Sequence, residues 1–447
     1  MLGKSTWLKE WNPEDPIFWK EKGSKIAWQT LTITTITLVL SFATWFMISA
    51  IVVRLPGIGF KFDTMQLFWI AAMPGLAGGS LRILHTFLIP IFGSRHIITI
   101  ATLLKLIPCI GIGLAILDPS TPFWVFLLLA FAAGFGGGDF SSYMPSTSIF
   151  FPKRLQGTAL GIQAGIGNFG VSLTQFVTPW IIGFAVFGTL AGDSQNFVKG
   201  EVQKSIWLQN AAFWYVPLLI LFAALSWYLI RSVPIKASFK EQLDIFKNKH
   251  TWFCTITYVM TFGSFSGFSA AFPLLIKIVY GDFQNAPDPL TYAFLGPLVG
   301  STIRVVAGPI SDKTGGAILT HIVGIGLIIS VLVMAFSGLL TPTSLDQFPY
   351  FVGLMLVIFF LSGIGNASTF RQYPIIFSHS ARQGAGVLGW TAAIAAYGPF
   401  IFSIFIGLAI TNTGSSVPFF IGIAFYYLIA TVINWWYYTR KGCEKPS

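Results

Sequence analysis

The chain has 447 residues, of which 54% are hydrophobic and only 10% are charged, whereas about a quarter of the residues of a soluble globular protein are charged. This composition excludes an ordinary soluble domain and indicates a membrane protein. The net charge of +11 would suggest nucleic-acid binding in a soluble chain, but so apolar a sequence leaves little polar surface for a groove, so we interpret the basic excess as a signal of membrane topology.

The apolar stretches have the lengths of membrane-spanning helices. A spanning helix needs about twenty mostly apolar residues, and turn or charge clusters divide the chain into twelve stretches of at least about this length. The twelve stretches are residues 30–53, 65–91, 97–117, 123–150, 155–187, 208–230, 252–279, 289–310, 317–340, 350–377, 384–411 and 417–439. The sequence therefore predicts an all-α membrane protein with twelve transmembrane helices.

The polar segments divide the chain into two six-helix halves. The longest polar stretch between helices, residues 231–250, is basic and amphipathic and follows the sixth helix. The amino-terminal stretch carries both signs of charge and no apolar core that ends at a small-residue cleavage site, so we expect no removable signal peptide. We expect an amino-terminal segment 1–28, a first bundle 29–230, a linker 231–250, a second bundle 251–439 and a tail 440–447.

The distribution of Lys and Arg predicts the orientation. With the amino terminus inside, eighteen of these residues fall in inner segments: Lys4, Lys9, Lys20, Lys22, Lys25, Arg95, Lys153, Arg154, Arg231, Lys236, Lys240, Lys247, Lys249, Lys313, Arg382, Arg440, Lys441 and Lys445. Five fall in outer segments: Arg54, Lys61, Lys199, Lys204 and Lys277. We therefore expect both termini and the linker to be cytoplasmic.

Metal, redox and enzyme chemistry have little support in the sequence. The three cysteines, Cys109, Cys254 and Cys443, lie in separate segments and form no Cys-x-x-Cys motif. The five histidines are scattered, without metal-ligand spacing and without a candidate catalytic triad. We expect no cofactor, no metal site and no enzymatic activity.

An internal repeat places two arginines at equivalent positions. PGLAGGSLRILHTFLIPIFGSR in the second predicted helix aligns with GPLVGSTIRVVAGPISDKTGG in the eighth, which pairs Arg82 with Arg304 and Gly93 with Gly315 at one constant offset. GFGGGDFSSYMP (134–145) resembles GIGNASTFRQYP (363–374), and GTALGIQAGIGNFG (157–170) resembles GAGVLGWTAAIAAYG (384–398). Three similar segments in the same order indicate a duplicated transporter fold.

The two arginines indicate an anion site. A guanidinium near the middle of a bilayer costs from about 3 kcal/mol to much more unless it has water, a partner or a ligand. Arg82 and Arg304 lie too deep in their predicted helices to reach the interface easily, and acidic residues in the predicted spans are scarce. Since arginine does not deprotonate in proteins, the pair would form two fixed cations around an anion near the pseudo-twofold axis.

Small residues are frequent within the repeated segments 157–170 and 363–374. Gly and Ala allow transmembrane helices to approach closely, and such smooth contacts would also permit rocking between halves. Six glycines at suitable spacings are candidates for these roles: Gly161, Gly165, Gly167, Gly170, Gly363 and Gly365.

Two sets of motifs resemble a known family. GPISDKTGG (308–316), with Gly308, Asp312, Lys313 and Gly315, is similar to the gating loop of the major facilitator superfamily. The segments 11–19, 134–172 and 363–377 resemble the amino-terminal segment and the two signatures of the nitrate/nitrite porters, the NarK-type bacterial members among them. The resemblance covers nearly the whole chain and implies a major facilitator fold.

The resemblance also implies a substrate site and a function. In that family a planar anion lies between two arginines, which map onto Arg82 and Arg304. A tyrosine contact maps onto Tyr258, the signature asparagine onto Asn168, and the rings that cover the anion onto Phe42, Phe140 and Phe262. The expected activity is nitrate/nitrite antiport by alternating access, carried out by a monomer in the bacterial inner (plasma) membrane, with the lipid bilayer and these anions as its partners.

Two departures from the family leave the coupling open. Asp139 stands where we expect asparagine, and Arg371 stands where we expect glutamine. The two would form an ion pair between the fourth and tenth helices, or Asp139 would instead titrate and make the protein a nitrate/proton symporter. Lys105 in the third helix has no assigned role, and we interpret it as a paired or snorkelling lysine. Rival hypotheses are a channel and a facilitator for another small anion.

Overall fold

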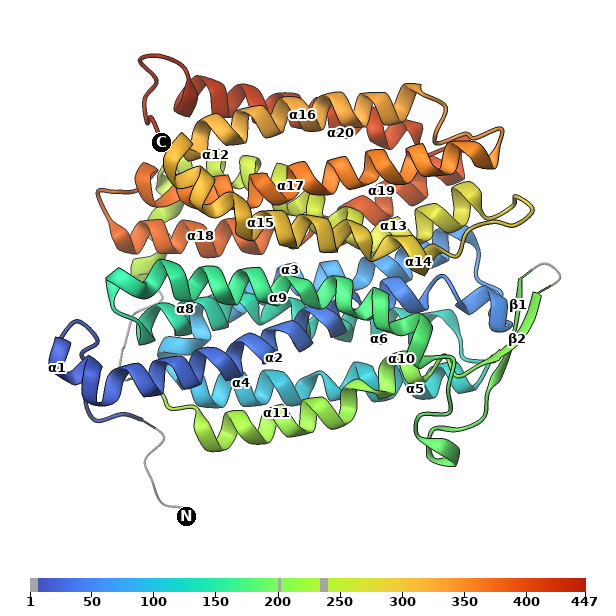
Figure 1. The fold of residues 1–447 in the computed structure, drawn as a ribbon, viewed down its shortest axis with the longest axis horizontal. Coiled ribbons are helices and arrows are strands. Elements are labelled where there is room, and N and C mark those ends of the chain that lie inside the picture. The colour runs from blue at the N-terminus through green and yellow to red at the C-terminus, as the bar shows by residue number, and fades with distance from the viewer. Residues whose placement is uncertain (1–6, 200–201, 234–239) are drawn as a thin grey trace.

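The computed structural model describes residues 7–199, 202–233 and 240–447, and its helices run roughly side by side along the long axis of the molecule (Figure 1). The first six residues of the expected amino-terminal segment, with Lys4, lie outside the described residues. So do residues 234–239 of the expected linker, with Lys236, and residues 200–201. We call the elements up to α11 the first half and the elements from α12 onward the second half.

The first half begins with a short helix and a π-helical turn that lead into the first long helix. Its helices are α1 (Pro16–Phe18), α2 (Ser24–Ile51), α3 (Thr64–Phe92), α4 (Ser94–Leu104), α5 (Leu106–Leu117), α6 (Phe123–Ala133), α7 (Phe135–Gly138), α8 (Phe140–Phe150), α9 (Lys153–Ile181), α10 (Asn210–Phe213) and α11 (Tyr215–Leu229). Short turns at η1 (Trp19–Gly23), η2 (Leu55–Ile58) and η3 (Gly188–Ala191), and the strands β1 (Gln195–Lys199) and β2 (Val202–Ile206), complete it.

The second half has the same plan. Its helices are α12 (Lys249–Tyr258), α13 (Ser264–Tyr280), α14 (Pro289–Ala293), α15 (Leu295–Thr314), α16 (Gly316–Phe336), α17 (Phe348–Ile376), α18 (Ala381–Ala395), α19 (Gly398–Thr413) and α20 (Val417–Asn434). The turns are η4 (Lys240–Lys247), η5 (Val259–Gly263), η6 (Leu345–Gln347) and η7 (Trp435–Thr439), of which η5 and η7 are π-helical.

The helices account for all twelve expected spans. Eleven helical segments of the described chain are long and apolar enough to cross a membrane. The fifth expected span, α9, has 29 residues but is too polar to meet the same measure of hydropathy. Its buried face carries Gln163, Asn168 and Gln175, and the helix packs between α2 and α15. The polar helix of the set therefore lies where the two halves meet.

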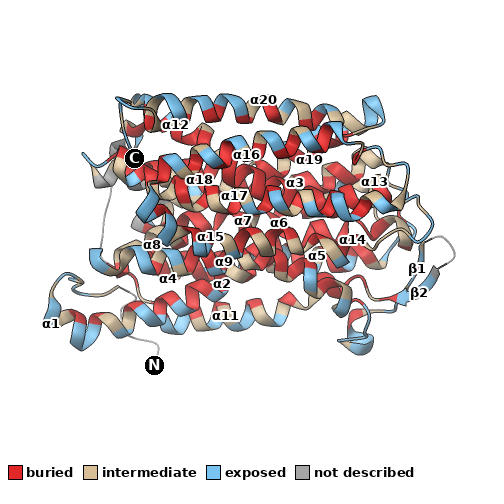
Figure 2. Ribbon diagram, turned by 45° about the horizontal axis from the view of Figure 1, so that its top comes forward, coloured by how far each residue is buried: buried red, intermediate tan, exposed pale blue. Residues whose placement is uncertain are grey.

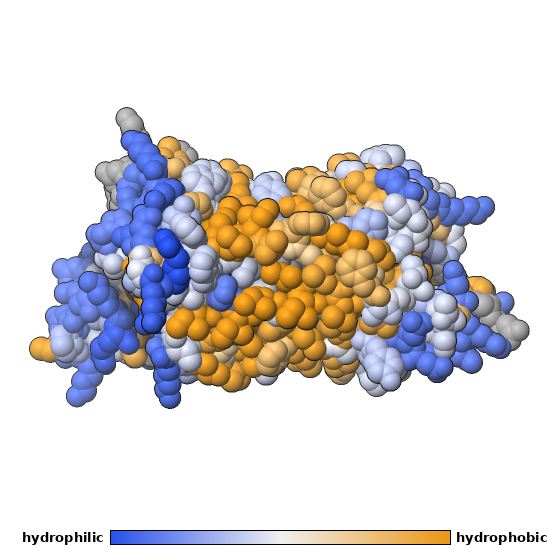
Figure 3. Space-filling view, turned by 90° about the horizontal axis from the view of Figure 1, so that it is seen from above, coloured by the Kyte–Doolittle hydropathy of each residue, from blue (hydrophilic) through white to orange (hydrophobic). Residues whose placement is uncertain are grey.

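Polarity is segregated along the long axis. Buried residues concentrate in the middle of the bundle (Figure 2), and apolar side chains cover the middle of the visible surface, whereas hydrophilic ones gather at its two ends (Figure 3). Such a belt matches the hydrocarbon layer of a bilayer. The first described residues and the carboxyl end of the chain lie at one end of the bundle, which we call the terminal end (Figure 1). The strands lie at the opposite end, the hairpin end (Figure 1).

The repeat has matching backbone geometry in the two halves. Gly93 ends α3 with φ +79°, and Gly315 ends α15 with φ +89°. Residues with a Cβ rarely adopt positive φ, so glycine is required at both turns. The equivalence that the sequence predicts is therefore present as two similar helix endings.

Contacts between the halves close the hairpin end. Arg54, which follows α2, donates to both carboxylate oxygens of Asp288 at 2.7 and 2.5 Å. Lys277 of α13 donates to the Val53 carbonyl at 2.9 Å. From the hairpin, Lys199 donates to the Ala286 carbonyl at 3.0 Å. Ionic and polar contacts thus connect the halves at this end.

The hairpin supports this closure and was not expected from the sequence. Strands β1 and β2 pair antiparallel, with Phe197 opposite Lys204. The buried ring of Phe197 lies 5.3 Å from the guanidinium carbon of Arg54. The hairpin therefore covers the cation that bridges the two halves.

Candidate functional site

Arg82 lies at the centre of the bundle and connects its halves. Its side chain on α3 is fully buried. Nε donates to the Gly137 carbonyl at 2.8 Å, and Nη1 donates to the Ala392 carbonyl of α18 in the second half at 2.7 Å. Nη2 has no hydrogen-bond partner. Because an unpaired buried donor is costly, this nitrogen marks a position for an acceptor that the protein itself does not supply.

Aromatic rings surround the Arg82 guanidinium. Its central carbon lies within cation–π distance of four ring centroids: 4.9 Å from Phe140, 5.2 Å from Trp45, 5.3 Å from Phe262 and 6.0 Å from Phe42. The three phenylalanines are those that the family resemblance implied, and they come from α2, α8 and η5. The tryptophan, one turn along α2 from Phe42, was missed because tryptophan is common in this chain.

Arg304 and Tyr258 complete the centre from the second half. Arg304 is buried, neither Nη1 nor Nη2 has a partner, and its guanidinium carbon lies 5.1 Å from the Phe370 ring. Tyr258 stacks on Phe370 at 4.9 Å and on Phe262 at 5.5 Å. Its hydroxyl lies close enough to Arg82 and Arg304 to interact with both guanidiniums. Two arginines, a tyrosine and a set of parallel rings thus meet in one place.

The close packing around Arg82 depends on the glycine run of the fourth span. A Cβ on Gly137 would lie 2.7 Å from Trp45 Cε2 and 2.8 Å from the Gly78 Cα, and a Cβ on Gly136 would lie 2.2 Å from the Ser41 carbonyl oxygen. Only glycine leaves room for these approaches. The run therefore brings the Gly137 carbonyl within reach of Arg82.

Two buried asparagines have free side-chain amides. Asn168 of α9 and Asn366 of α17 are fully buried, and neither the oxygen nor the nitrogen of either amide has a partner. Asn168 is the expected signature residue. Asn366 lies one helical turn before Phe370 and therefore on the same face of α17. Asn366 and Phe370 were missed, although both belong to the glycine-rich segment that the repeat singles out.

The expected ion pair between Asp139 and Arg371 is wrong. Asp139 is fully buried; its Oδ2 contacts Lys105 Nζ and accepts from the Ser41 hydroxyl at 2.6 Å. Arg371 instead pairs with Asp312 of α15, Nε to Oδ1 at 2.6 Å, although its N–H does not point along this line. The two residues lie in corresponding segments of the repeat, and these segments belong to different halves. The paired role we considered for Lys105 is the observed one.

The expected gating loop lies at the terminal end. Asp312 and Lys313 are exposed in the last turn of α15, and Gly315 ends that helix. A Cβ on Gly308 would meet no atom within 4 Å. The observed role of Asp312 is its pair with Arg371, which joins α15 to α17.

The candidate packing glycines fall into three groups. Cβ atoms on Gly167 and Gly170 would lie 2.7 Å from Leu38 Cδ2 and 2.2 Å from the Val39 carbonyl oxygen, so these two glycines pack α9 against α2. Similar distances from Gly363 to the Gly300 carbonyl (2.3 Å) and from Gly365 to Thr261 (2.4 Å) show packing within the second half. A Cβ on Gly165 would lie 2.8 Å from Val305 of the other half, and one on Gly161 would meet nothing within 4 Å. Among the six candidates, Gly165 is therefore the one with a close contact between the halves.

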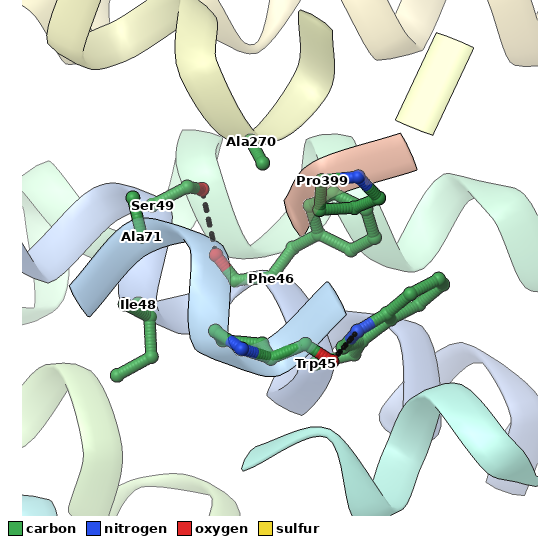
Figure 4. Close-up of a pocket in the computed structure, with 8 residues that line it drawn as sticks. Trp45, Phe46, Ile48, Ser49, Ala71, Ala270 and Pro399 are labelled. Carbon is green, nitrogen blue, oxygen red and sulfur yellow. Dashed lines mark hydrogen bonds between the residues drawn. The ribbon is translucent and has the colours of Figure 1, made fainter. Parts of the chain in front are cut away.

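The centre is flanked by hollows of different size. Toward the hairpin end, Figure 4 shows a small hollow between α2, α3, α13 and α19. It is lined by Trp45, Phe46, Ile48, Ser49, Ala71, Pro74, Ala270 and Pro399. Toward the terminal end, a larger hollow lies between α3, η4 and α18 and is lined by Ile83, Thr86, Ile245, Phe246, Gly386, Trp390 and Ala393. One hollow thus lies between the halves toward each end of the bundle.

The described part of the chain has no group of three or more His, Cys, Asp or Glu side chains that could hold a metal ion. The functional groups at the centre are instead guanidiniums, a phenol, amides and aromatic rings. Such groups can bind a small flat anion by charge-assisted hydrogen bonds at its edge and by ring contacts at its faces.

Comparisons with known proteins identify relatives over the full length of the chain. Residues 33–381 match the Major Facilitator Superfamily. The chain is 61% identical to a probable nitrate/nitrite antiporter, NarK2, of Thermus thermophilus, over 99% of both chains. It is 36% identical to the nitrate/nitrite transporter NarU of Escherichia coli strain K12, over 97% of this chain and 96% of the other.

Two solved structures share the fold at low identity. A bacterial homologue of the human lysosomal transporter Spinster is 15% identical with a TM-score of 0.68, over 92% of this chain and 96% of the other. The nucleoside transporter NupG is 12% identical with a TM-score of 0.60, over 91% of this chain and 98% of the other.

Proposed function

Because this chain belongs to the Major Facilitator Superfamily, and within it to the NarK/NarU nitrate/nitrite transporters, we propose that it exchanges nitrate for nitrite across a bacterial inner membrane by alternating access. The observation that carries the proposal is the central pair of arginines. Arg82 and Arg304 offer three buried nitrogens without a protein acceptor, inside a set of aromatic rings. Both residues occupy equivalent places in the repeat.

The geometry suits flat monoanions. Arg82 Nη2 and the Nη atoms of Arg304 would donate to the edge oxygens of the anion, and the Tyr258 hydroxyl would add a further donor. The rings of Phe140, Phe262 and Phe370 would cover its faces. Nitrate and nitrite are both planar and singly charged, so one site of this shape accepts both, whereas a tetrahedral anion would clash with the rings.

Two fixed cations also provide a reason for obligatory exchange. Arg82 and Arg304 are near enough to repel each other, so closure of the two halves around an empty site is opposed. A bound anion relieves the repulsion and allows the halves to pass through the closed state. Return of the carrier then requires another anion, which is antiport.

The surroundings of Asp139 favour antiport over the proton symport that we considered. A titrating carboxylate would be expected without a close cation, but Lys105 contacts Asp139 directly. The paired acid needs no proton for the anion to bind. We therefore propose that the transport cycle moves anions alone.

The orientation follows from charge. Basic residues are far more numerous in the segments of the terminal end than in those of the hairpin end, so we propose that the terminal end is cytoplasmic. The two bundles would rock as units joined by the linker 231–250, and the monomer would be the functional unit. The described conformation, closed at the hairpin end, is then the one closed to the outside.

The test is transport by the purified protein in proteoliposomes. Labelled nitrate should enter vesicles that contain nitrite, should enter much more slowly into nitrite-free vesicles with an inward proton gradient, and should show counterflow. Acetate and lactate outside should not compete. Proton-driven uptake equal to exchange would contradict antiport, and uptake that saturates without any internal anion would indicate a channel.

A further inference from the structure

A buried ion pair lies directly behind the anion site. Lys105 stands at the junction of α4 and α5, and Asp139 stands at the junction of α7 and α8; both are fully buried. Lys105 Nζ contacts Asp139 Oδ2, which also accepts from the Ser41 hydroxyl at 2.6 Å. This cluster is not part of the site proposed above.

The pair adjoins the groups that hold Arg82. Asp139 follows Gly137, whose carbonyl accepts from Arg82 Nε at 2.8 Å, by two residues. It immediately precedes Phe140, whose ring lies 4.9 Å from the same guanidinium. The Asp139 charge is near enough to Arg82 to interact with it. A carboxylate is therefore built in beside the cation that we expect to receive the substrate.

Such a carboxylate would oppose anion binding if it stood alone. In a low-dielectric interior it would repel an approaching anion and attract Arg82, and so compete as an internal counter-ion. In the structure it faces Lys105 instead, and Arg82 Nη2 keeps no protein acceptor. We propose, on the basis of the nitrate function above, that Lys105 is a positioning residue that holds and neutralises Asp139 so that Arg82 stays available to the anion.

The groups around Asp139 determine how the protein responds when Lys105 is removed. Ser41 of α2, Arg82 and His85 of α3, Lys105, and Tyr143 of α8 face or adjoin the carboxylate. His85 Nδ1 lies 4.0 Å from Asp139 Oδ1 and 3.0 Å from the Ser142 hydroxyl. Without the lysine, His85 is the neighbouring side chain of the kind that takes up a proton near neutral pH.

Single substitutions in the pair should act in opposite directions. The nitrate KM for exchange into nitrite-loaded proteoliposomes should rise about tenfold or more in Lys105→Met, because the lone carboxylate repels the anion. In Asp139→Asn the KM should be no higher than in wild type, since a cation remains. The double variant Lys105→Met/Asp139→Asn, which carries neither charge, should bring the KM back toward wild type.

The pH profile separates this role from a merely structural one. Lowering the pH from about 7.5 to about 5.5 should restore nitrate affinity in Lys105→Met, since a proton on His85, 4.0 Å from Asp139, offsets the extra negative charge. The other variants should show no such recovery. Lys105→Arg, which keeps the charge, tests the same idea if Lys105→Met does not fold. Lys441→Met, at an exposed tail lysine, is the matched control.

The results distinguish two failures. No nitrate uptake by the wild type would overturn the proposed function. Wild-type uptake with an unchanged KM in Lys105→Met, or equal increases of KM in both single variants without recovery in the double variant, would overturn only the positioning role of Lys105. The thermal stability of each purified variant shows whether that variant is folded, and only the transport data of folded variants are interpreted.

Discussion

Arg82 and Arg304 occupy equivalent places in the repeat, but their surroundings differ. Arg82 donates to two carbonyls, one from each half, and is enclosed by four rings. Arg304 lies beside the Phe370 ring and keeps both Nη atoms unpartnered. Arg82 is therefore fixed by the protein, whereas Arg304 retains more hydrogen-bonding capacity for a ligand. The two repeat-related arginines therefore differ in how many hydrogen bonds they make to the protein.

Replacement of either arginine by lysine should abolish transport. Lysine keeps the charge but loses the planar fork. In Arg82→Lys at least two charge-assisted hydrogen bonds are lost, on the order of 3 kcal/mol or about a hundredfold in exchange rate. The assay is nitrate counterflow at matched expression, with the exposed Arg154→Lys as control. Near wild-type counterflow in Arg82→Lys or Arg304→Lys would be incompatible with a paired-arginine site.

Tyr258→Phe should weaken nitrate binding moderately. The substitution keeps the ring stacked between Phe262 and Phe370 and removes one hydroxyl, a loss of about 1 kcal/mol or roughly fivefold in KM. The nitrate KM of exchange measures it, and Tyr350→Phe, at an exposed tyrosine, is the control. An unchanged KM would mean that the hydroxyl does not contact the anion.

At the scale of elements, apolar length and repetition predicted most of the fold. The membrane requires long apolar helices, and the repeat paired Gly93 with Gly315. The breaks at Lys105 and Asp139 were not predicted. Both residues keep right-handed helical dihedral angles, and the glycines before Asp139 were interpreted as packing residues inside one span. The hairpin was missed because its short alternating strands are weak signals beside twelve long helices.

Three phenylalanines of the site, Phe42, Phe140 and Phe262, came from resemblance to a family, whereas Trp45 and Phe370 were missed. Ion-pair partners could not be inferred from the resemblance. Which charges meet depends on which helices are neighbours and on which faces they share. The segments that contain Asp139 and Arg371 are similar in sequence because they occupy corresponding positions in the two halves. This similarity does not mean that the two residues are in contact. Lys105 contacts Asp139 because α4 and α5 pack beside the fourth span, and this neighbourhood has no local sequence signal.

Gly170→Ala should destabilise the protein, whereas Gly161→Ala should not. The new methyl group at residue 170 would lie 2.2 Å from the Val39 carbonyl oxygen, where the α2 backbone must move, and at residue 161 it meets open space. Overpacking of this kind costs about 1–3 kcal/mol. Thermal unfolding of the purified variants in detergent measures the difference. Equal melting temperatures would show that α2 and α9 adjust without cost.

At the scale of the whole molecule, the described conformation is held closed at one end. Arg54 of the first half and Asp288 of the second half form the ionic part of this closure. Burial is the largest single effect and disfavours the charge on Asp288, but Arg54, the Leu290 backbone N–H and Lys204 together outweigh it, so the pKa of the Asp288 carboxyl lies below its usual value. A lowered pKa in the closed form means that deprotonation of Asp288 favours closure.

The pH dependence of this closure has a definite sign. The contribution of Asp288 is fully present above the pKa of a free carboxyl, about 3.9, and is lost only as the pH falls through the lowered value in the closed form. Access from the hairpin end should therefore be constant between about pH 5 and pH 8. Labelling rates of a cysteine at Ser49, in a Cys443→Ser background, measure this access. A rise in labelling at mildly acidic pH would contradict the assignment.

Asp288→Asn should open the hairpin end at neutral pH. The amide cannot neutralise Arg54, so the labelling rate of the Ser49 cysteine should increase several-fold while the exposed Asp282→Asn control stays at the starting rate. An unchanged rate in Asp288→Asn would assign the closure to the hydrogen bonds of Lys277 and Lys199 instead.

The hairpin has no counterpart in the second half. Between α9 and α11 the chain forms β1 and β2, whereas between α19 and α20 it has only residues 414–416. In a perfectly duplicated carrier the two orientations would be mirror images of equal free energy. The hairpin adds contacts at only one end of the bundle, so we expect the orientation closed at the hairpin end to have the lower free energy of the two.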